Sequence, residues 1–502
     1  MSPAIRSKMF SDILPPPAML IQGEDVTITG ISVDSREVVP GDLFVAKRGL
    51  KDSGSRYIDD AIAKGARAIL MDDSSKSSVQ GNVSLARIPN LDKSLSAIAN
   101  TFFDEPSEHL SVTGVTGTNG KTSCCFWYAW LSNQLGTPCA QIGTLGAGYH
   151  NQAEESLVTT GMTTPEAVRV QSILADVLGL GASATVMEVS SHGLDQGRVE
   201  AVIFESAIFT NFTQDHLDYH GDMNAYFAAK ASLFEREELR RAILNKDDST
   251  FGQLAAAVAD NTELFSYSLS HSAADLFVEH VSWTDKGAEV VLNGRWGKFE
   301  VIVPVIGEYN LANVLAVVAA LISSGISADL VVSALAGLPP VPGRMQLISR
   351  PHCPRVVVDY AHTPDAVSNA LQALRSQVKG RLIVVLGCGG DRDRGKRVPM
   401  ARAAAEGADV CWFTSDNPRF ENPKDILDEM ASCIEGESVR IVAKREDAIQ
   451  QAIELASPED LVAVLGKGHE TYQEIAGSRI PFSDVEQCES ALDGMLVGVS
   501  AE

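Results

Sequence analysis

A glycine-rich turn between a strand-like run and an apolar run constrains this chain most. The stretch reads Val112-Thr-Gly-Val-Thr-Gly-Thr-Asn-Gly-Lys-Thr-Ser123, and an apolar, helix-length run from Cys124 to Leu135 follows it. A strand, a glycine-rich turn and a helix form the geometry of a phosphate-binding loop, because glycines let backbone N–H groups turn inward on an anion. Lys121 can reach the β- and γ-phosphates, and the Thr122 hydroxyl can bind Mg²⁺. The stretch therefore predicts a loop that binds a nucleotide phosphate.

The match to the usual phosphate-loop pattern is incomplete. In G-x-x-x-x-G-K-[ST], Val115 stands at the position of the first glycine. The stretch alone leaves open a second interpretation, a glycine-rich turn that contains a lysine by chance. The other polar motifs of the chain favour the phosphate loop.

Length and charge limit the class of protein. At 502 residues the chain is too long for one hydrophobic core, so two to four domains are expected. The formal net charge of −24 counts against a large nucleic-acid or membrane-surface footprint, because both need a basic face. An anionic substrate must then be held by local Lys, Arg and Mg²⁺. We expect no nucleic acid and no membrane among the partners.

Cysteine usage and apolar runs indicate a cytoplasmic protein. The eight cysteines include no C-x-x-C pair, which favours buried free thiols in a reducing cytosol. The N-terminus lacks an apolar signal core, and no apolar run reaches the length of a membrane span. We therefore expect a cytoplasmic location.

Helix and strand patterns divide the chain into three α/β regions. Residues 1–108 predict a small α/β domain. Residues 109–341 alternate strands with helices, which predicts a largely parallel sheet with covered faces. The expected helices of these two regions span 58–66, 95–103, 164–178, 224–235, 309–323 and 328–336, and the expected strands span 68–71, 138–142, 184–190, 207–212 and 242–245.

Two further features complete the pattern. Residues 264–305 predict short alternating strands that form an antiparallel flap on the sheet edge. The proline-rich turn at 339–343 predicts a linker. Residues 342–502 then restart the alternation, with strands expected over 355–360, 381–386, 410–413, 439–442 and 461–465.

Polar clusters follow two strands of the region that carries the loop. Parallel sheets place ligands at the carboxyl ends of their strands. Glu188 ends one predicted strand and His216 follows the next, so both are candidates to meet Lys121 and Thr122 around the nucleotide and a metal ion. A carboxylate and an imidazole suit a divalent ion already held by phosphates and hydroxyls. The alternative for each residue alone is a helix N-cap or a solvated loop group.

Lys230 lies on a small, apolar helix face, after Ala-Tyr-Phe-Ala-Ala and before Ala-Ser-Leu-Phe. A lysine in this setting either extends its ammonium to water or has a depressed pKa. A neutral amine can take up CO₂ as a carbamate and become an anionic ligand. The residues alone favour the extended, solvated lysine.

Four polar clusters end strands of the last region. They are Val358–Pro364, Leu386–Arg397, Thr414–Arg419 and Leu465–Glu470. Because the carboxyl ends of parallel strands lie on one edge of a sheet, these clusters predict one site.

The order of these motifs resembles that of the Mur ligases. The resemblance rests on Asp34-Ser-Arg36, Gly117–Thr122, Glu188–His192, Asn211–Gly221, Gly307–Asn310, Pro342–Arg344, Asp359–Pro364, Gly387–Arg392 and Asp416–Arg419. It covers nearly the whole chain. It implies an α/β protein with three domains: a UDP-binding domain over 1–108, a central P-loop ATPase domain with a mostly parallel sheet over 109–341, and a C-terminal, Rossmann-like amino-acid-binding domain over 342–502.

The resemblance also implies an activity. It implies ATP-dependent amide-bond formation through an acyl phosphate, with ATP and Mg²⁺, in peptidoglycan precursor synthesis. The implied substrates are UDP-N-acetylmuramoyl-L-alanyl-D-glutamate and meso-2,6-diaminopimelate. We expect the protein to act as a monomer.

By this resemblance, residues of the chain fall into four sets. The implied ATP-binding residues are Gly117, Thr118, Asn119, Gly120, Lys121, Thr122, Ser123, Asn310, Arg344 and Asp359. The implied metal ligands are Thr122, Glu188, His216 and a carbamylated Lys230, and the implied catalytic residues are Lys121, Glu188, His216 and Lys230. The residues implied to bind the UDP-substrate are Ser35, Thr163, Thr164, Ser190, Gln196 and Arg198, and those implied to bind diaminopimelate are Arg392, Asp416, Asn417, Pro418, Arg419, Gly466 and Glu470.

Two departures from the family pattern concern contacts to the sugar and the uridine. Met162 stands where close relatives can carry a polar residue, and Leu50-Lys51-Asp52 replaces a less charged stretch. Two other protein classes share parts of this pattern. Folylpolyglutamate synthetase shares the ATPase core, but the long N-terminal region and the Asp416–Arg419 motif count against it. A non-catalytic assembly protein on a ligase fold is disfavoured by the intact Lys121 and Lys230.

Overall fold

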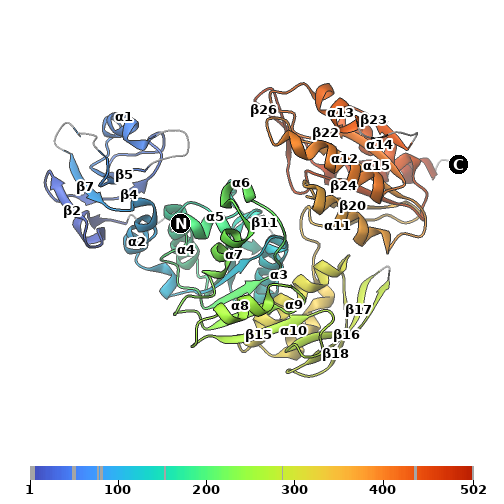
Figure 1. Ribbon diagram of the computed structural model, residues 1–502, viewed down its shortest axis with the longest axis horizontal. Helices are drawn as coiled ribbons and strands as arrows, with labels where there is room; N and C mark the ends of the chain where they lie inside the picture. Colours follow the sequence, from blue (N-terminus) through green and yellow to red (C-terminus); the bar gives the residue numbers. More distant parts are fainter. Residues whose placement is uncertain are drawn as a thin grey trace. The chain divides into compact units, whose positions relative to one another are not determined.

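The computed structural model describes residues 6–499 except 48–52, 76–78, 80–82, 152–153, 156, 285, 433 and 435–437. Its fold divides into two compact units, coloured along the chain in Figure 1. The first unit contains Met1–Glu279, Leu292–Phe299 and Ala312–Ala334. The second contains His280–Val291, Glu300–Leu311 and Leu335–Glu502. The predicted domain boundaries at 108 and 341 both fall between regular elements and stay predictions.

A five-stranded sheet opens the described part of the first unit, in the order β2-β7-β6-β5-β4. Its strands are β2 (Met19–Gln22), β4 (Gly30–Ser32), β5 (Asp42–Ala46), β6 (Ala68–Asp72) and β7 (Ser84–Ile88). Helices α1 (Ile58–Ala63) and α2 (Leu91–Phe102) confirm the two predicted helices. Strands β1 (Lys8–Met9) and β3 (Thr27–Ile28) form a separate antiparallel pair.

The large sheet places the phosphate loop at its centre. Its order is β11-β10-β9-β12-β8-β13-β14-β15-β16-β17-β18 in the described residues. The parallel strands around the loop are β9 (Cys139–Gly143), β12 (Ala184–Glu188), β8 (Ser111–Thr116), β13 (Ser206–Phe209), β14 (Arg241–Asn245) and β15 (Glu263–Ser268). Strands β10 (Gly146–Asn151) and β11 (Glu154–Glu155) form an antiparallel edge that the sequence pattern did not predict.

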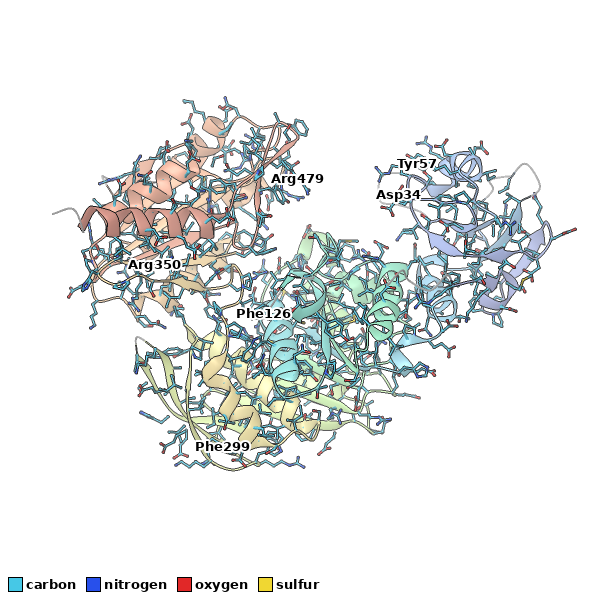
Figure 2. All side chains as sticks on the ribbon, turned by 180° about the vertical axis from the view of Figure 1, so that it is seen from behind. Asp34, Tyr57, Phe126, Phe299, Arg350 and Arg479 are labelled. Carbon is cyan, nitrogen blue, oxygen red and sulfur yellow. The ribbon has the colours of Figure 1, made fainter. Side chains whose placement is uncertain are left out.

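Helices connect these strands. They are α3 (Lys121–Gln134), α4 (Ala167–Gly179), α5 (Ser191–Asp195), α6 (Leu217–His220), α7 (Met223–Ala231), α8 (Phe251–Ala257), α9 (Glu308–Ser323) and α10 (Ala328–Ala334). Helix α7 packs against α5 and α6, and the three helices lie side by side in Figure 1. Phe126, labelled on α3 in Figure 2, is buried.

The prediction of an antiparallel flap from residue 264 is wrong at its start, where two successive strand pairings are parallel. Strand β15 pairs in parallel with β14, from Arg241 with Glu263 to Asn245 with Tyr267. The reason is α8, which lies between the two strands and returns the chain to the same end of the sheet, as a parallel crossover requires. Strand β16 (Leu276–Thr284) also pairs in parallel with β15, and β17 (Gly287–Gly294) and β18 (Phe299–Val303) follow it.

The second unit contains a doubly wound sheet, which confirms the Rossmann-like prediction. Its strand order is β19-β20-β24-β21-β22-β23 in the described residues. The strands are β19 (Gln346–Ile348), β20 (Arg355–Asp359), β21 (Leu382–Cys388), β22 (Val410–Ser415), β23 (Val439–Ile441) and β24 (Leu461–Leu465), and only β19 runs antiparallel to its neighbour.

Alternate residues of these strands enter two cores. Val357 packs in the core with residues of α11 (Pro364–Arg375), α12 (Arg397–Gly407) and α13 (Pro423–Ala431). Val356 and Val358 pack in the other, with α14 (Arg445–Leu455) and α15 (Asp484–Val499). Successive strand side chains point to opposite faces, so the sheet is covered on both sides. A hairpin of β25 (Tyr472–Ile475) and β26 (Ser478–Pro481) carries Arg479, labelled in Figure 2.

The described cysteines agree with the prediction of buried free thiols. Seven of the eight are free and buried: Cys124, Cys125, Cys139, Cys353, Cys388, Cys411 and Cys488. Cys433 lies outside the described residues, as does the Leu50-Lys51-Asp52 departure. Among the helices that the structure describes, none has the length and hydrophobicity needed to cross a bilayer.

Candidate nucleotide and amino-acid sites

The phosphate loop has the predicted strand–turn–helix geometry. Strand β8 ends at Thr116 and α3 begins at Lys121, and the turn contains Gly117 with φ +145° and Gly120 with φ +89°. A Cβ at Gly117 would overlap the Thr210 hydroxyl, so only glycine fits this backbone. The departure at Val115 is explained, because this residue lies inside β8, fully buried and paired with Glu188 on the neighbouring strand.

The polar cluster after β13 holds the loop in place. The Asn211 side chain accepts a hydrogen bond from the Asn119 N–H at 3.0 Å and donates to the Asn119 carbonyl at 3.1 Å. The Thr118 N–H donates to the Asn211 carbonyl at 2.8 Å. The Lys121 Nζ donates to the carbonyls of Gly117 and Thr118, both at 2.9 Å. The loop is therefore ordered by protein contacts, with its lysine folded back over it.

Thr122 and Glu188 form the oxygen-rich part of the site. The Thr122 hydroxyl donates to Glu188 Oε2 at 3.0 Å, and the Thr144 N–H donates to Glu188 Oε1 at 2.7 Å. Glu188 is 2% exposed and Thr122 is 7% exposed. Hydroxyl and carboxylate oxygens are the ligands that Mg²⁺ prefers, so this pair fits the ion beside a bound phosphate.

The sequence predicts that His216 lies near Thr122 and Glu188. The environment of His216 favours the neutral form of its imidazole ring. The residue has φ +53° at the start of α6, and its side chain is half-exposed. Burial lowers its pKa, and the charges of Lys121 and Lys230 lower it further, against an opposing effect of Asp215. The structure shows no cluster of three His, Cys, Asp or Glu side chains fit for a metal among the residues it describes. The metal ligand set stays a prediction.

Lys230 is buried, so the prediction that it extends to water is wrong. Its side chain is 1% exposed, and Nζ donates to the Gly117 carbonyl at 2.8 Å. The same nitrogen lies 4.6 Å from the centre of the Tyr226 ring. Burial lowers the pKa of Lys230 well below its ordinary value, and the charge of Lys121, whose amine shares the Gly117 carbonyl, lowers it further. The amine therefore lies against the phosphate loop and away from solvent.

Five of the six residues implied for the UDP-substrate lie near Glu188. The Thr164 hydroxyl donates to the Glu188 carbonyl at 2.9 Å, and its oxygen also lies 3.0 Å from Ser190 Oγ. Thr163 accepts from the Thr144 hydroxyl at 3.3 Å. Thr164 is 1% exposed, so it orders this turn from inside.

Arg198 joins two other residues that are implied to bind the UDP-substrate, Gln196 and Thr164. Its guanidinium donates to Gln196 Oε1 at 2.7 Å and to the Thr164 carbonyl at 2.7 Å. It also donates to the Met162 sulfur at 3.4 Å, so the Met162 departure contacts an implied substrate residue. Ser35 follows β4, and its carbonyl accepts from Lys64 Nζ at 2.9 Å. Among the contacts of the described residues, none joins Ser35 to Arg198.

In the second unit, Asn417 joins two parts of the implied diaminopimelate site. Its Nδ2 donates to Glu470 Oε2 at 2.8 Å, and its Oδ1 accepts from the Glu474 N–H at 2.8 Å. Burial raises the pKa of Asp416, and the charges of Lys467 and Arg445 oppose this effect. Strand ends β22 and β24 therefore meet here, as the sequence predicted.

Arg419 is held by a residue that the sequence reasoning did not select. It has φ +50°, its Nη1 donates to the Gly390 carbonyl at 2.7 Å, and its Nε lies 3.5 Å from Glu474 Oε2. The acid that pairs with Arg419 is therefore Glu474, on the 472–481 hairpin. Glu421 instead pairs with the buried Arg397 at 2.7 Å. Strand alternation in the 472–481 hairpin is the signal that could have pointed to Glu474.

The other implied residues of this unit are placed as follows. Arg392 is exposed, and Gly466 has φ +114° with its N–H donating to the Asp359 carbonyl at 3.1 Å. Asp359 accepts from the Met345 N–H at 2.7 Å, and burial raises its pKa. The Arg344 guanidinium lies 4.6 Å from the Tyr360 ring centre. Asn310 is 4% exposed and donates to the Ile306 carbonyl at 3.0 Å.

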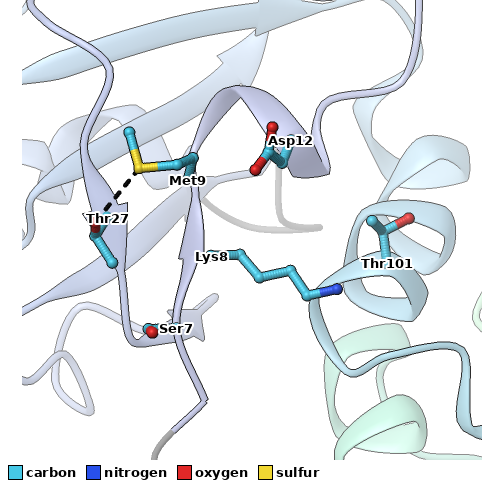
Figure 3. Close-up of a pocket in the computed structure, with 6 residues that line it drawn as sticks. All are labelled: Ser7, Lys8, Met9, Asp12, Thr27 and Thr101. Atoms are coloured by element: carbon cyan, nitrogen blue, oxygen red, sulfur yellow. Dashed lines mark hydrogen bonds between the residues drawn. The ribbon is translucent and has the colours of Figure 1, made fainter.

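One cavity lies apart from these residues. It has a volume of about 460 Å³ and is drawn in Figure 3. Its lining residues are Ser7, Lys8, Met9, Asp12, Thr27 and Thr101. Lys8 is paired with Asp104 at 2.7 Å, and the Thr27 hydroxyl donates to the Met9 sulfur. None of the implied site residues lines it.

Comparison with known families decides the classification. Residues 27–102 match the catalytic domain of the Mur ligase family, residues 115–321 match the Mur ligase middle domain, and residues 343–468 match the Mur ligase glutamate ligase domain. A relative from Alkalilimnicola ehrlichii is 43% identical, over 96% of this chain and 98% of its own length. The chain belongs to the Mur ligase family.

Other Mur ligases agree with this placement. The relative from Alkalilimnicola ehrlichii is named UDP-N-acetylmuramoyl-L-alanyl-D-glutamate–2,6-diaminopimelate ligase, as is one from Ectopseudomonas mendocina that is 45% identical over 93% of this chain and 95% of its own. A solved structure titled with the same enzyme name is 34% identical, with a TM-score of 0.70, and covers 97% of this chain and 99% of its own. The three-domain Mur ligase fold predicted from sequence is confirmed.

Proposed function

We propose that this chain is an ATP-dependent ligase that joins meso-2,6-diaminopimelate to UDP-N-acetylmuramoyl-L-alanyl-D-glutamate in the cytoplasm, as a step of peptidoglycan precursor synthesis. One observation carries the proposal: similarity over nearly the full length to relatives that bear this enzyme name, at 43% and 45% identity. The geometry supports it, because the phosphate loop and the polar cluster around Asn417 are both intact.

The chemistry follows from the need to activate a carboxylate. A substrate carboxylate oxygen attacks the γ-phosphorus of ATP, the bond to the ADP oxygen breaks, and an acyl phosphate forms. The diaminopimelate amine then attacks the acyl carbon, inorganic phosphate leaves, and the amine loses a proton. Phosphoryl transfer needs positioning and charge neutralisation above all. Lys121 and the loop N–H groups supply both.

Thr122 and Glu188 would hold Mg²⁺, which neutralises phosphate charge when bound. Glu188 is already oriented for this by two donors, the Thr122 hydroxyl and the Thr144 N–H. An acyl phosphate hydrolyses in water, so the site must exclude solvent before the amine attacks.

Lys230 is proposed to act as a carbamate. The neutral amine that burial favours attacks CO₂, forms an N–C bond and loses a proton. The carbamate retains one N–H, which matches the single hydrogen bond to the Gly117 carbonyl. An ammonium here would place two cations on one carbonyl, because Lys121 contacts the same oxygen. A carbamate replaces one of these cations by an anion.

Arg419 is proposed to select diaminopimelate over lysine. Diaminopimelate carries a carboxylate beside its distal ammonium, and a guanidinium binds a carboxylate through two parallel hydrogen bonds. With lysine bound, the partly buried Arg419 would face an apolar chain end and a like charge. A site built around such a contact rejects the analogue that lacks it.

The test is a ligation assay with purified protein, ATP, Mg²⁺, UDP-N-acetylmuramoyl-L-alanyl-D-glutamate and a panel of amino acids. We expect ADP release that depends on both substrates, and a product whose mass equals the UDP-dipeptide plus diaminopimelate minus water. A folylpolyglutamate synthetase would release ADP with a folate and glutamate instead. Absence of ligation with every amino acid would favour the non-catalytic alternative.

A further inference from the structure

A buried lysine lies in the middle of the proposed diaminopimelate site. Lys467 is 0% exposed, and its Nζ donates to Glu470 Oε2 at 2.8 Å and to Asn417 Oδ1 at 3.2 Å. The same nitrogen lies 5.7 Å from the centre of the Tyr472 ring. Both hydrogen-bond acceptors belong to the residues implied to hold the amino acid.

Asn417 closes a triangle of hydrogen bonds with Lys467 and Glu470. Its Nδ2 donates to the same Glu470 Oε2 at 2.8 Å. Asn417 Nδ2 and Lys467 Nζ both donate to Oε2 and so fix the orientation of the carboxylate. Among the described residues, the hydrogen bonds to Glu470 are all made to Oε2. The Glu470 side chain keeps 20% of its surface exposed. Oε1 is therefore the oxygen that remains available to a ligand.

Charge balance gives Lys467 a second role. Two carboxylates, Asp416 and Glu470, lie near each other, and Asp416 is 9% exposed. Burial raises the pKa of Asp416, the Lys467 and Arg445 charges lower it, and the Glu470 charge raises it. The charge of Lys467 therefore offsets part of the effect of burial on the Asp416 carboxyl.

We propose that Lys467 is a positioning residue that orients the Glu470 carboxylate and aims its Oε1 at an ammonium group of the incoming diaminopimelate. This inference rests on the proposed function. A purely structural role of Lys467 would predict something different, because loss of a structural lysine would change the KM values of all three substrates alike. A positioning role affects the amino acid alone.

The experiment compares Lys467→Met with wild type in steady-state ligation. Hydrogen bonds to charged groups contribute enough that the KM for diaminopimelate should rise about 10- to 100-fold. The KM values for ATP and the UDP-substrate should stay within about twofold. Lys467→Arg, which keeps the cation and its donors, should recover part of the loss. Lys424→Met is the matched control, since Lys424 pairs with Asp428 at 2.7 Å but is exposed.

A double variant tests the partner. In a Glu470→Gln background, Lys467→Met should raise the KM for diaminopimelate much less than it does in wild type. If Lys467→Met fails to fold by circular dichroism, Lys467→Gln, which keeps two donors without the charge, replaces it. An unchanged KM for diaminopimelate, or equal increases for all three substrates, would overturn the role of Lys467. A wild-type protein that does not ligate diaminopimelate would instead overturn the proposed function.

Discussion

Lys230→Met should separate catalysis from stability at one buried position. The variant removes a hydrogen bond between Nζ and the Gly117 carbonyl, which contributes about 0.5–1.5 kcal/mol. Methionine has nearly the same length and volume, so the exchange adds less than about 1.5 kcal/mol of packing cost. Loss of a group that stabilises developing charge costs about 3–4 kcal/mol of barrier, or roughly 10²- to 10³-fold in rate. Activity should therefore fall far more than stability.

The stability difference between Lys230→Met and wild type should depend on pH in a defined direction. The pKa of Lys230 is lower in the folded than in the unfolded state, so the unfolded chain binds more protons between the two values. In CO₂-free buffer the lysine therefore costs stability at low pH, and this cost disappears as pH rises to the unfolded value of about 10.4. The difference in Tm, Lys230→Met minus wild type, should be most positive at low pH and should decrease toward pH ~10.

The assay measures turnover and thermal unfolding of the same preparations. Lys230→Ala should be nearly inactive and should recover part of its activity with a short added carboxylate such as formate. Lys246→Met is the matched control, because Lys246 also donates to a carbonyl and lies 5.6 Å from an aromatic ring centre, but is only partly buried. A folded Lys230→Met with near-wild-type turnover would refute the role of Lys230.

Three further predictions address other parts of the chain. Lys121→Ala should lower ligation roughly 10³-fold or more with an unchanged Tm, and near-normal turnover would contradict the ATP-site assignment. Arg419→Ala should lower kcat/KM for diaminopimelate about 10³- to 10⁴-fold while the KM for ATP stays constant, and Arg479→Ala on the neighbouring hairpin serves as control. Burial raises the pKa of Asp460, but hydrogen bonds from Arg381 and Ser457 outweigh it and lower the pKa to about 2. Asp460→Asn should therefore cost about 1–2 kcal/mol of unfolding free energy at pH 7, a difference that shrinks between about pH 4 and pH 2 in chemical denaturation.

Local patterns in the sequence predicted most of the fold. The alternation of strands and helices predicted the parallel sheets, because period-2 and period-3.6 patterns reflect which face each element buries. The missed edge strands β10 and β11 lie on glycine-containing and polar residues that carry no such pattern. The direction of β15 was also missed, since it depends on whether α8 forms, and that helix buries only Leu254 among its residues.

The sequence predicted the site residues that lie at the ends of strands. It did not predict those whose positions depend on side-chain contacts between distant segments. Thr122 and Glu188 come together as the strand-end rule predicts. The burial of Lys230 could not be predicted from its own helix, because its Nζ contacts the Gly117 carbonyl of the phosphate loop, which is far away in the sequence. Glu474 was not selected, since its contact with Arg419 depends on a hairpin lying beside the turn.

The most direct test of the central claim is the ratio of kcat/KM for meso-diaminopimelate to that for lysine, measured with wild-type protein, ATP and UDP-N-acetylmuramoyl-L-alanyl-D-glutamate. A buried polar contact that only diaminopimelate completes predicts a ratio of roughly 10⁴. Comparable values for the two amino acids would contradict diaminopimelate specificity while leaving ligase activity in place. Failure to use either amino acid would contradict the proposed function itself.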